Sequence, residues 1–226
     1  MVILHIPLAK KGTATVSKRE QPPGKKPQIL DATAALLSQR GLQALSFENV
    51  ANEAGLSRQL VRYYYTDLDD LMVDLSDHLA AMYREILVGG ILKVGKVERL
   101  DFFLDFFFDL IADHPMPVNL ETYDALVAYS VGCDRLRERM CDQYRTLGHA
   151  VVNELHIAYP EMSVAAGEEL SFLFTSMMHA HWSFVASLRH SREHGKLARR
   201  AIERLIRSYQ ADPAAGPVIE RPWARR

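Results

Sequence analysis

Two short runs of apolar residues with helical spacing lie on either side of one glycine, Gly55. The first run repeats at i, i+3, i+4 and i+7, which places its members on one face of a helix; they are Phe47, Val50, Ala51 and Ala54. Gly55 can adopt the left-handed backbone that ends a helix in a tight turn. Ser46 and Ser57 are good N-caps for the helices before and after this turn. The spacing therefore predicts a helix-turn-helix, in which a turn containing glycine joins two short helices.

The rest of the chain also carries apolar residues at helical spacing, and no segment shows the sustained alternation of a strand. Pro27 is a good first helical residue, Gly41 a good stop and Asp67 a good N-cap. The glycine-rich stretch from Gly89 to Gly95 is expected to break the long helix that begins at Asp67. The predicted fold class is all-α with about nine helices, near residues 27–40, 46–54, 57–65, 67–88, 100–110, 119–131, 136–159, 168–189 and 197–209.

Charge is unevenly distributed along the 226 residues. Up to Tyr65 the chain has nine basic and four acidic residues, whereas the remainder has 18 basic and 24 acidic residues. A basic end joined to an acidic body favours contact between that end and a polyanion. The two cysteines are expected to be reduced thiols. No apolar run is long enough to span a membrane and no signal peptide is recognised, so we expect a cytoplasmic protein without membrane contact.

The second helix of the predicted motif combines basic and aromatic residues. In a helix-turn-helix this helix lies in the DNA major groove, with its N-terminal residues against base edges. Arg58 can donate two hydrogen bonds to guanine, Gln59 can pair with adenine, and Leu60 can touch a thymine methyl. The remaining candidates suit phosphates or base edges; they are Ser46, Ser57, Arg62, Tyr63 and Tyr64. The alternative is a buried aromatic cluster with surface arginines, and for Tyr65 we expect burial in the core.

Four motifs in this region resemble the N-terminal domain of the TetR (tetracycline-repressor) family of bacterial transcriptional regulators. They are Ile29-Leu30-Asp31-Ala32 and residues 41–46, 50–57 and 58–65, and the resemblance covers roughly residues 28–71. Leu68 stands where a phosphate-contacting lysine is frequent, Glu48 where a basic or neutral residue is common, and Arg62 where tyrosine is frequent. Losing one phosphate contact at position 68 should flatten the salt dependence of DNA binding by about one unit of slope.

The resemblance implies an N-terminal three-helix helix-turn-helix domain at 27–71 and a larger helical ligand-binding and dimerisation domain at 72–211. Residues 1–26 are expected to form a flexible basic arm, and residues 212–226 a loose tail. An aromatic and methionine-rich interior suits a pocket for an apolar ligand, although each such residue alone is more often plain core. The candidate ligand-binding residues are Phe103, Phe107, Tyr123, Tyr144, Phe174, Met178, His181 and Trp182, and His114 and His179 are further polar candidates.

The last two helices, which form a dimeric bundle in proteins of this family, carry more apolar residues than one core face needs. Two sets of apolar residues on these helices cannot all lie on one face. One set is Phe172, Trp182 and Phe184, and the other is Leu173, Met177 and Val185. A surplus apolar face implies a partner. Because two-fold dimers are the commonest assembly, we expect a homodimer through the last two helices.

These observations predict a ligand-responsive transcriptional regulator, and a repressor is favoured. A small apolar or aromatic effector would release it from a palindromic double-stranded DNA operator. The alternatives are an activator of the same fold and a helical small-molecule-binding protein without sequence-specific DNA binding. We expect no enzyme activity, no cofactor and no metal site. Residues 90–97 lack the hydroxyl and the preceding strand of a P-loop, and the H-x-x-E-H of residues 190–194 lies among basic residues that would repel a cation.

Overall fold

The computed structural model describes residues 24–96, 98–113, 120–211 and 221–223. Over these residues the prediction of an all-α fold is confirmed, with nine α-helices and no strand. The helices are α1 (Lys25–Arg40), α2 (Phe47–Ala54), α3 (Arg58–Tyr64), α4 (Leu68–Ile91), α5 (Arg99–Phe107), α6 (Glu121–Ser130), α7 (Asp134–Ala158), α8 (Val164–Trp182) and α9 (His194–Ala211). Two short turns accompany them, the 3-10 turn η1 (Leu42–Ala44) and the π-helical turn η2 (Ser183–Ser187).

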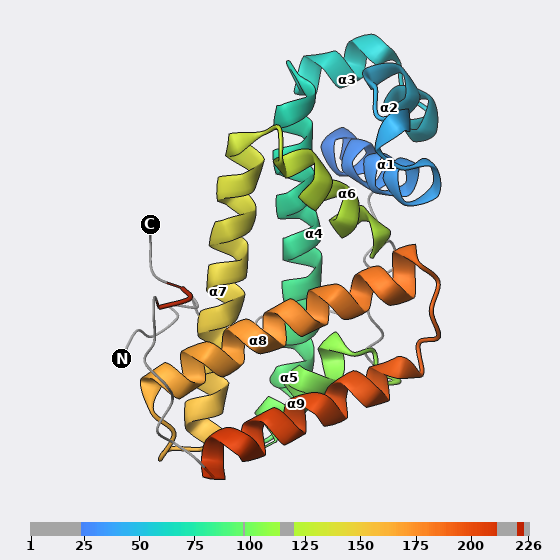
Figure 1. Ribbon diagram of the computed structural model, residues 1–226. Helices are drawn as coiled ribbons and strands as arrows, with labels where there is room; N and C mark the ends of the chain where they lie inside the picture. Colours follow the sequence, from blue (N-terminus) through green and yellow to red (C-terminus); the bar gives the residue numbers. More distant parts are fainter. Residues whose placement is uncertain (1–23, 97, 114–119, 212–220, 224–226) are drawn as a thin grey trace, which may run out of the picture.

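The helices are arranged as a small N-terminal unit on a larger helical body (Figure 1). The unit consists of α1, α2 and α3, and α4 runs from it into the body with α7 beside it. Helices α8 and α9 cross the far end of the body next to each other. Of the helices described, none combines the length and apolar character that a membrane crossing needs. Most of the expected basic arm, together with His114, lies outside the described residues.

Local sequence signals account for the helix-turn-helix. The hydroxyls of Ser46 and Ser57 each accept a hydrogen bond from the backbone amide three residues later, at 3.1 and 3.2 Å. Both predicted N-caps are therefore confirmed. Gly55 has φ 63° and ψ 34°, the left-handed conformation that glycine adopts without steric cost. The turn between α2 and α3 thus has the geometry that the position of Gly55 predicts.

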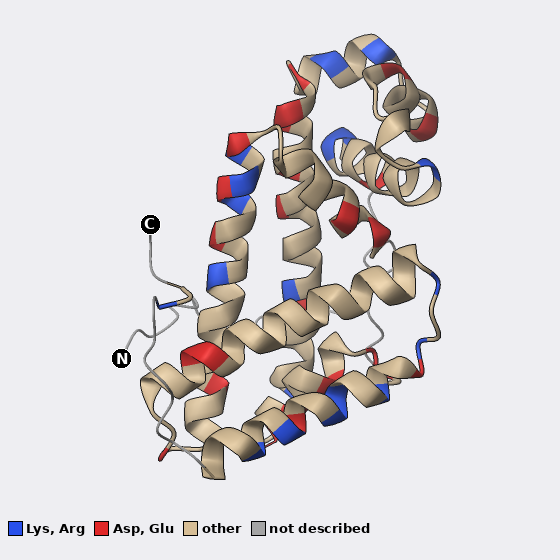
Figure 2. Ribbon diagram, viewed as in Figure 1, with Lys and Arg blue, Asp and Glu red and all other residues tan. Residues whose placement is uncertain are grey.

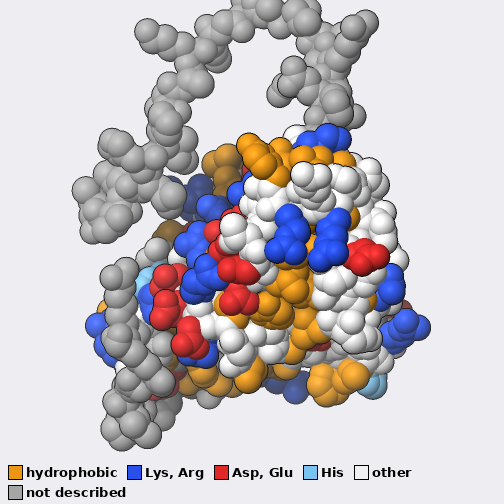
Figure 3. All heavy atoms as spheres, turned by 90° about the horizontal axis from the view of Figure 1, so that it is seen from above, with side chains coloured by type: hydrophobic (Ala, Val, Ile, Leu, Met, Phe, Trp, Pro, Cys, Tyr) orange, Lys and Arg blue, Asp and Glu red, His pale blue; other side chains and the backbone are white. Residues whose placement is uncertain are grey.

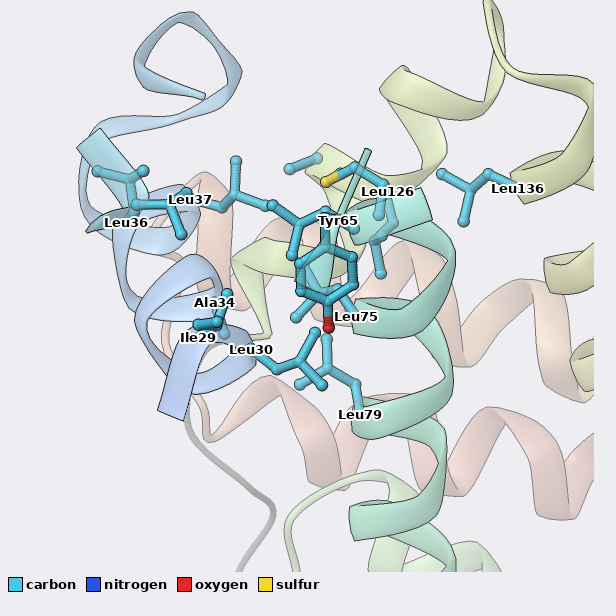
Figure 4. Close-up of a cluster of buried hydrophobic side chains, with 14 of the residues drawn as sticks. Ile29, Leu30, Ala34, Leu36, Leu37, Tyr65, Leu75, Leu79, Leu126 and Leu136 are labelled. Atoms are coloured by element: carbon cyan, nitrogen blue, oxygen red, sulfur yellow. The ribbon is translucent and has the colours of Figure 1, made fainter. Parts of the chain in front are cut away.

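The N-terminal unit shares one apolar core with the body. Tyr65, which is 2% exposed, lies between α1 and α4 close to Leu30 and Leu75 (Figure 4). The prediction that Tyr65 belongs to the core is confirmed. Leu126 of α6 and Leu136 of α7 belong to the same cluster and are fully buried. Because the core is shared, the position of the helix-turn-helix depends on the positions of α4, α6 and α7.

The long helix α4 begins and ends where the sequence predicts. Asp67 caps it as expected, accepting a hydrogen bond from the Asp70 amide at 2.8 Å. The helix ends at Ile91, inside the glycine-rich stretch from Gly89 to Gly95 that is expected to break it, after continuing through Gly89 and Gly90. A Cβ on Gly90 would lie 2.0 Å from the Cζ atom of Phe102 in α5. This glycine therefore makes room for an aromatic ring instead of ending the helix.

Two other helices begin before the predicted residue. Helix α1 starts at Lys25, and Pro27 lies in its first turn. Proline lacks a backbone N–H, but the N–H groups of the first turn make no hydrogen bond within the helix, so none is lost. Helix α8 was expected over 168–189 but spans Val164–Trp182. Its start is fixed by Ser163, whose hydroxyl accepts from the Ala166 amide at 3.1 Å. After Trp182 the chain changes to the wider π-helical turn η2.

Trp182 is buried on the inward face of α8, in agreement with its place in the predicted aromatic interior. The sequence indicates that Phe172, Trp182 and Phe184 cannot all share one face with Leu173, Met177 and Val185. The latter three are only partly buried. The most buried large side chains, 1–5% exposed, are Phe174, Met178 and Trp182. Trp182 can be buried because its indole N–H donates to the Phe107 carbonyl at 2.9 Å, so its one polar group is satisfied inside the core.

Candidate nucleic-acid interface and effector site

The outer face of α3 is exposed and basic. Arg58, Gln59, Arg62 and Tyr63 line a shallow, open depression on it. Tyr63 is 81% exposed, although a large aromatic side chain in a folded protein is normally buried at least in part. The opposite face of this seven-residue helix holds it to the core through Val61, which is fully buried. Such a helix presents polar and aromatic groups to a partner outside the molecule.

Neighbouring side chains orient this face. The Arg62 guanidinium lies over the ring of Phe47 in α2, 5.4 Å from its centroid. The rings of Tyr63 and Tyr64 meet edge to face at 5.4 Å. Leu60 is only partly exposed, which leaves less of it for a thymine methyl than the prediction assumed. The stacking of Arg62 on Phe47, which the sequence analysis did not predict, limits the conformations from which this arginine can reach a phosphate.

The two capping serines keep part of their hydrogen-bonding capacity. In Ser46 and Ser57 the hydroxyl oxygen accepts from a backbone amide, so each hydroxyl hydrogen can still be donated to a phosphate. Ser57 is exposed and Ser46 is half-buried. All eight candidate DNA-contacting residues thus lie on α3 or at the N-terminal ends of α2 and α3.

An acidic cluster, Asp67, Asp69 and Asp70, stands beside this face at the start of α4. Figure 3 looks onto this end of the molecule and shows basic side chains near its centre and acidic side chains to one side. Arg135 of α7 is 2.6 Å from Asp70, 3.3 Å from Asp67 and 3.7 Å from Asp69. The Thr66 hydroxyl and the Arg135 guanidinium lower the pKa of Asp70. Asp70 is therefore charged at neutral pH, and Arg135 of α7 offsets part of the negative charge of the cluster.

Leu68 lies inside this acidic cluster and packs against the apolar core. It is partly buried there, and its apolar side chain offers no charge to a phosphate. Glu48, the second departure from the family pattern, is exposed on α2.

The predicted ligand-binding residues form part of a second apolar core. Phe103, Phe107, Phe174, Met178 and Trp182 are buried in it together. Tyr123 and Tyr144 are half-buried and pack against both cores. These two tyrosines therefore lie at the junction between the second apolar core and the core that holds the helix-turn-helix.

Three rings meet at this junction and are called the aromatic cluster: Tyr83 of α4, Tyr123 of α6 and Trp182 of α8. Their ring centroids are 5.5–5.6 Å apart in all three pairs. The Tyr83 hydroxyl is buried and has no hydrogen-bond partner among the described residues. Burial raises the pKa of the Tyr83 phenol, so the hydroxyl is protonated and can donate to a ligand or water. Tyr83 is not among the residues predicted from the sequence, where its only signal is its place four residues after Leu79 in the apolar stripe of α4.

Polar groups border the aromatic cluster. The Tyr144 hydroxyl and His179 Nδ1 are 3.1 Å apart, within hydrogen-bond distance. The carboxylate of Asp124 in α6 accepts hydrogen bonds from Ser183 and Ser187 of η2. Asp124 is not among the residues predicted from the sequence, because one aspartate in an amphipathic helix carries no distinctive pattern.

The described residues around Trp182 enclose only a small cavity. It measures about 20 Å³ and is lined by Phe107, Phe108, His181, Trp182 and others. A cavity of this size holds about one water molecule, whereas drug-sized ligands occupy roughly 300–1,000 Å³. Burial, and then the neighbouring His194, lower the pKa of His181, which is therefore neutral at pH 7. An effector of ordinary size would have to displace rings that now touch.

A helix-turn-helix with an exposed basic second helix, joined to a larger helical body, is an arrangement found in DNA-binding regulators. Comparison with known proteins narrows this class. Residues 29–75 match the family model described as bacterial regulatory proteins, tetR family. The HTH-type transcriptional repressor KstR2 of Rhodococcus jostii (strain RHA1) is 35% identical over a region covering 34% of this chain and 40% of that repressor.

Similarity to solved structures extends over most of the chain. The TetR transcription regulator from Haloarcula marismortui ATCC 43049 matches with a TM-score of 0.70 at 16% identity, covering 81% of this chain and 97% of that one. The multidrug binding protein EbrR, solved with imidazole, matches with a TM-score of 0.58 at 17% identity, covering 81% and 96%. The similarity to the tetR family is thus one of sequence over residues 29–75 and one of fold over most of the chain, and this chain spans 40% of the length of the curated repressor that it matches.

Proposed function

We propose that this protein is a ligand-responsive transcriptional repressor that a small apolar or aromatic effector releases from a palindromic DNA operator. The observation that carries the proposal is the exposed face of α3, where Arg58, Gln59, Arg62 and Tyr63 point away from the core. Arg58 and Gln59 stand at the N-terminal end of the helix, the part that contacts base edges in this motif. The relative KstR2 is itself described as a repressor.

Helix α6 supports a connection between the two sites. At one face the Thr122 hydroxyl donates to the Ala34 carbonyl of α1 at 3.2 Å. At another face Asp124 accepts from the serines of η2, and Tyr123 belongs to the aromatic cluster. A ligand that separates the rings of the aromatic cluster would move α6, and α6 touches the DNA-binding unit directly. We infer that effector binding repositions α1 and, with it, α3.

The mechanism is a shift between two populated states. DNA favours the state in which the two recognition helices of a dimer fit successive major grooves, and effector favours the other. The coupling is reciprocal, so operator DNA must weaken effector binding by the factor by which effector weakens operator binding. A 100-fold loss of operator affinity requires about 2.7 kcal/mol of coupling.

The effector class follows from the lining of the proposed site. Aromatic rings and Met178 supply apolar contact, and the Tyr83 hydroxyl, Tyr144 and His179 supply a few polar groups. EbrR, which shares the fold, is described as a multidrug binding protein. An activator of the same fold and a helical binding protein without sequence-specific DNA binding are the alternatives.

The homodimer is proposed to form through α8 and α9. Large apolar side chains are exposed on these helices and on the segment between them; they are Val164, Phe172, Phe184, Leu188 and Leu197. Figure 2 shows that α8 carries almost no charged residues, whereas α7 and α9 carry many. A helix with few charges and exposed apolar side chains is suited to burial against a second copy.

Replacing Phe184 and Leu197 together by glutamate is expected to convert the dimer to a monomer. These side chains are 54% and 59% exposed, so the substitutions should leave the core of one chain intact. Each partner of a two-fold dimer would bring both glutamates into the interface, and burying unpaired carboxylates there is costly in free energy. Sedimentation velocity should give a species near 25.6 kDa for the variant and near twice that for the unmodified chain.

Val131→Glu is a matched control, since Val131 is 81% exposed but lies at the turn between α6 and α7. The control should remain a dimer. A Phe184→Glu, Leu197→Glu chain that is still dimeric would show that the interface lies elsewhere.

A further inference from the structure

Residues 221–223 lie within the stretch expected to be a loose tail, yet they pack into the groove between α7 and α8. They are called the C-terminal clasp. The indole of Trp223 lies directly over Gly148 of α7, which is buried. A Cβ on Gly148 would be 2.2 Å from Trp223 Cε2 and 2.5 Å from Cζ2, closer than real Cβ contacts. The absence of a side chain at position 148 therefore creates the space that the indole occupies.

The groove also satisfies the polar group of the indole. Trp223 Nε1 donates to Ser171 Oγ at 3.0 Å, and Ser171 Oγ donates to the Gly148 carbonyl at 2.7 Å. The ring of Phe172 lies 5.7 Å from the indole and covers one of its sides. Trp223 is half-buried, and a tryptophan with its N–H bonded and its ring packed on a helix has the geometry of an anchor residue in a binding site.

Glu168 of α8 provides a charged contact at the same site. Its side chain is only 8% exposed, and a carboxylate so buried requires a partner. Arg221 supplies that partner: its Nε lies 2.9 and 3.1 Å from the two carboxylate oxygens, and its Nη2 bonds to one of them. The contact is bidentate, the form in which arginine recognises a carboxylate with most geometric specificity.

Three features of the groove thus match three features of the tail. The missing Cβ of Gly148 matches the indole ring, the Ser171 hydroxyl matches the indole N–H, and the Glu168 carboxylate matches the guanidinium. Neither DNA binding nor effector binding uses these groups. We propose that the groove between α7 and α8 is a peptide-binding site whose ligand is the Arg-Pro-Trp segment of the chain's own C-terminal region.

A seated clasp joins α7 to α8. Helix α7 in turn contacts α4 through Arg139, which lies 2.5 and 2.9 Å from the carboxylate oxygens of Asp77. The clasp therefore fixes the position of the helix that lies beside α4. The proposal concerns the folded chain and does not depend on the identity of the operator or effector.

The test is a double-mutant cycle of Gly148→Ala and Trp223→Ala in the full-length chain, read as the midpoint of thermal unfolding. In the unmodified chain, Gly148→Ala should lower the midpoint, because the new Cβ expels the indole. In the Trp223→Ala chain the space is open, and alanine is the better helix residue. There the same substitution should raise the midpoint by about 2–4 °C. The effect of Gly148→Ala on the unfolding midpoint should therefore change sign between the unmodified chain and the Trp223→Ala chain.

Gly89→Ala is the matched control. Gly89 also lies within a helix, and a Cβ there meets nothing within 4 Å. It should raise the midpoint in both backgrounds. If Gly148→Ala shifts the midpoint equally with and without Trp223, the indole does not occupy the groove and the proposal is wrong.

Tryptophan fluorescence gives a second, direct readout. The chain has two tryptophans, and Trp182 is buried in the second core. Gly148→Ala should shift the emission to longer wavelength as Trp223 enters water, and should cause no shift in a Trp223→Phe chain. Unchanged emission on introducing Gly148→Ala into the unmodified chain would overturn the proposal.

Discussion

Replacing Arg58 and Tyr63 together by alanine is expected to lower the affinity for operator DNA roughly 30- to 1,000-fold while the fold and the dimer persist. Arg58 is placed to make a bidentate contact with guanine, worth about 1–3 kcal/mol, and Tyr63 adds a contact to a phosphate or a base edge. A combined loss of about 2–4 kcal/mol gives this range. Both side chains are exposed on α3, so their truncation should change the free energy of unfolding by less than about 0.5 kcal/mol.

Fluorescence anisotropy with a labelled operator duplex at near-physiological salt measures this loss. Arg204→Ala provides the control, because Arg204 is an exposed arginine on α9 at the far end of the body from α3. Circular dichroism and sedimentation should be unchanged for all variants. Operator affinity that survives the double substitution in a folded dimer would favour the alternative of a helical binding protein whose helix-turn-helix is structural only.

Trp182→Ala is expected to lower the free energy of unfolding by about 3–5 kcal/mol, the range for removing a large aromatic residue from a core. The indole is 5% exposed and lies 5.6 Å from the rings of both Tyr83 and Tyr123. Its removal also leaves the Phe107 carbonyl without the N–H that it accepts at 2.9 Å. Trp182→Phe keeps a ring and loses the hydrogen bond, so it should cost less, about 1–3 kcal/mol.

Urea unfolding at one fixed protein concentration tests this prediction, since dimerisation makes apparent stability concentration-dependent. Leu92→Ala, at a position that is 71% exposed, should change the free energy by less than about 0.5 kcal/mol. A Trp182→Ala chain as stable as this control would show that the aromatic cluster does not hold α4, α6 and α8 together.

Features set by neighbouring residues in the sequence were predictable. The caps at Ser46, Ser57 and Asp67 each depend on a hydroxyl or carboxylate and an amide three residues later. The left-handed turn depends on Gly55 alone, and the burial of Tyr65 follows from its helical spacing to Val61. The DNA-contacting roles assigned to α3 remain predictions, although exposure of its basic face agrees with them.

Features set by distant residues were not predictable. Gly90 lies inside α4 with Phe102 packed where its Cβ would be, and the hydrogen bond of the buried Trp182 indole depends on the distant carbonyl of Phe107. Gly148 likewise has no local signal, since its partner Trp223 lies far along the chain. In each case a tertiary contact decides between two conformations that the local sequence permits equally well.

Selection of bound duplexes from a random DNA pool, at near-physiological salt and with the purified full-length protein, tests the central claim most directly. The account predicts a palindrome whose half-sites are about one helical turn apart, or regularly offset from that spacing, because a two-fold dimer places two α3 helices in the major groove. In the Arg58→Ala variant, the preference for one base should weaken at the position of each half-site that Arg58 contacts. Binding that is salt-sensitive and blind to sequence would contradict the account, because it would mean that α3 contacts only the phosphate backbone.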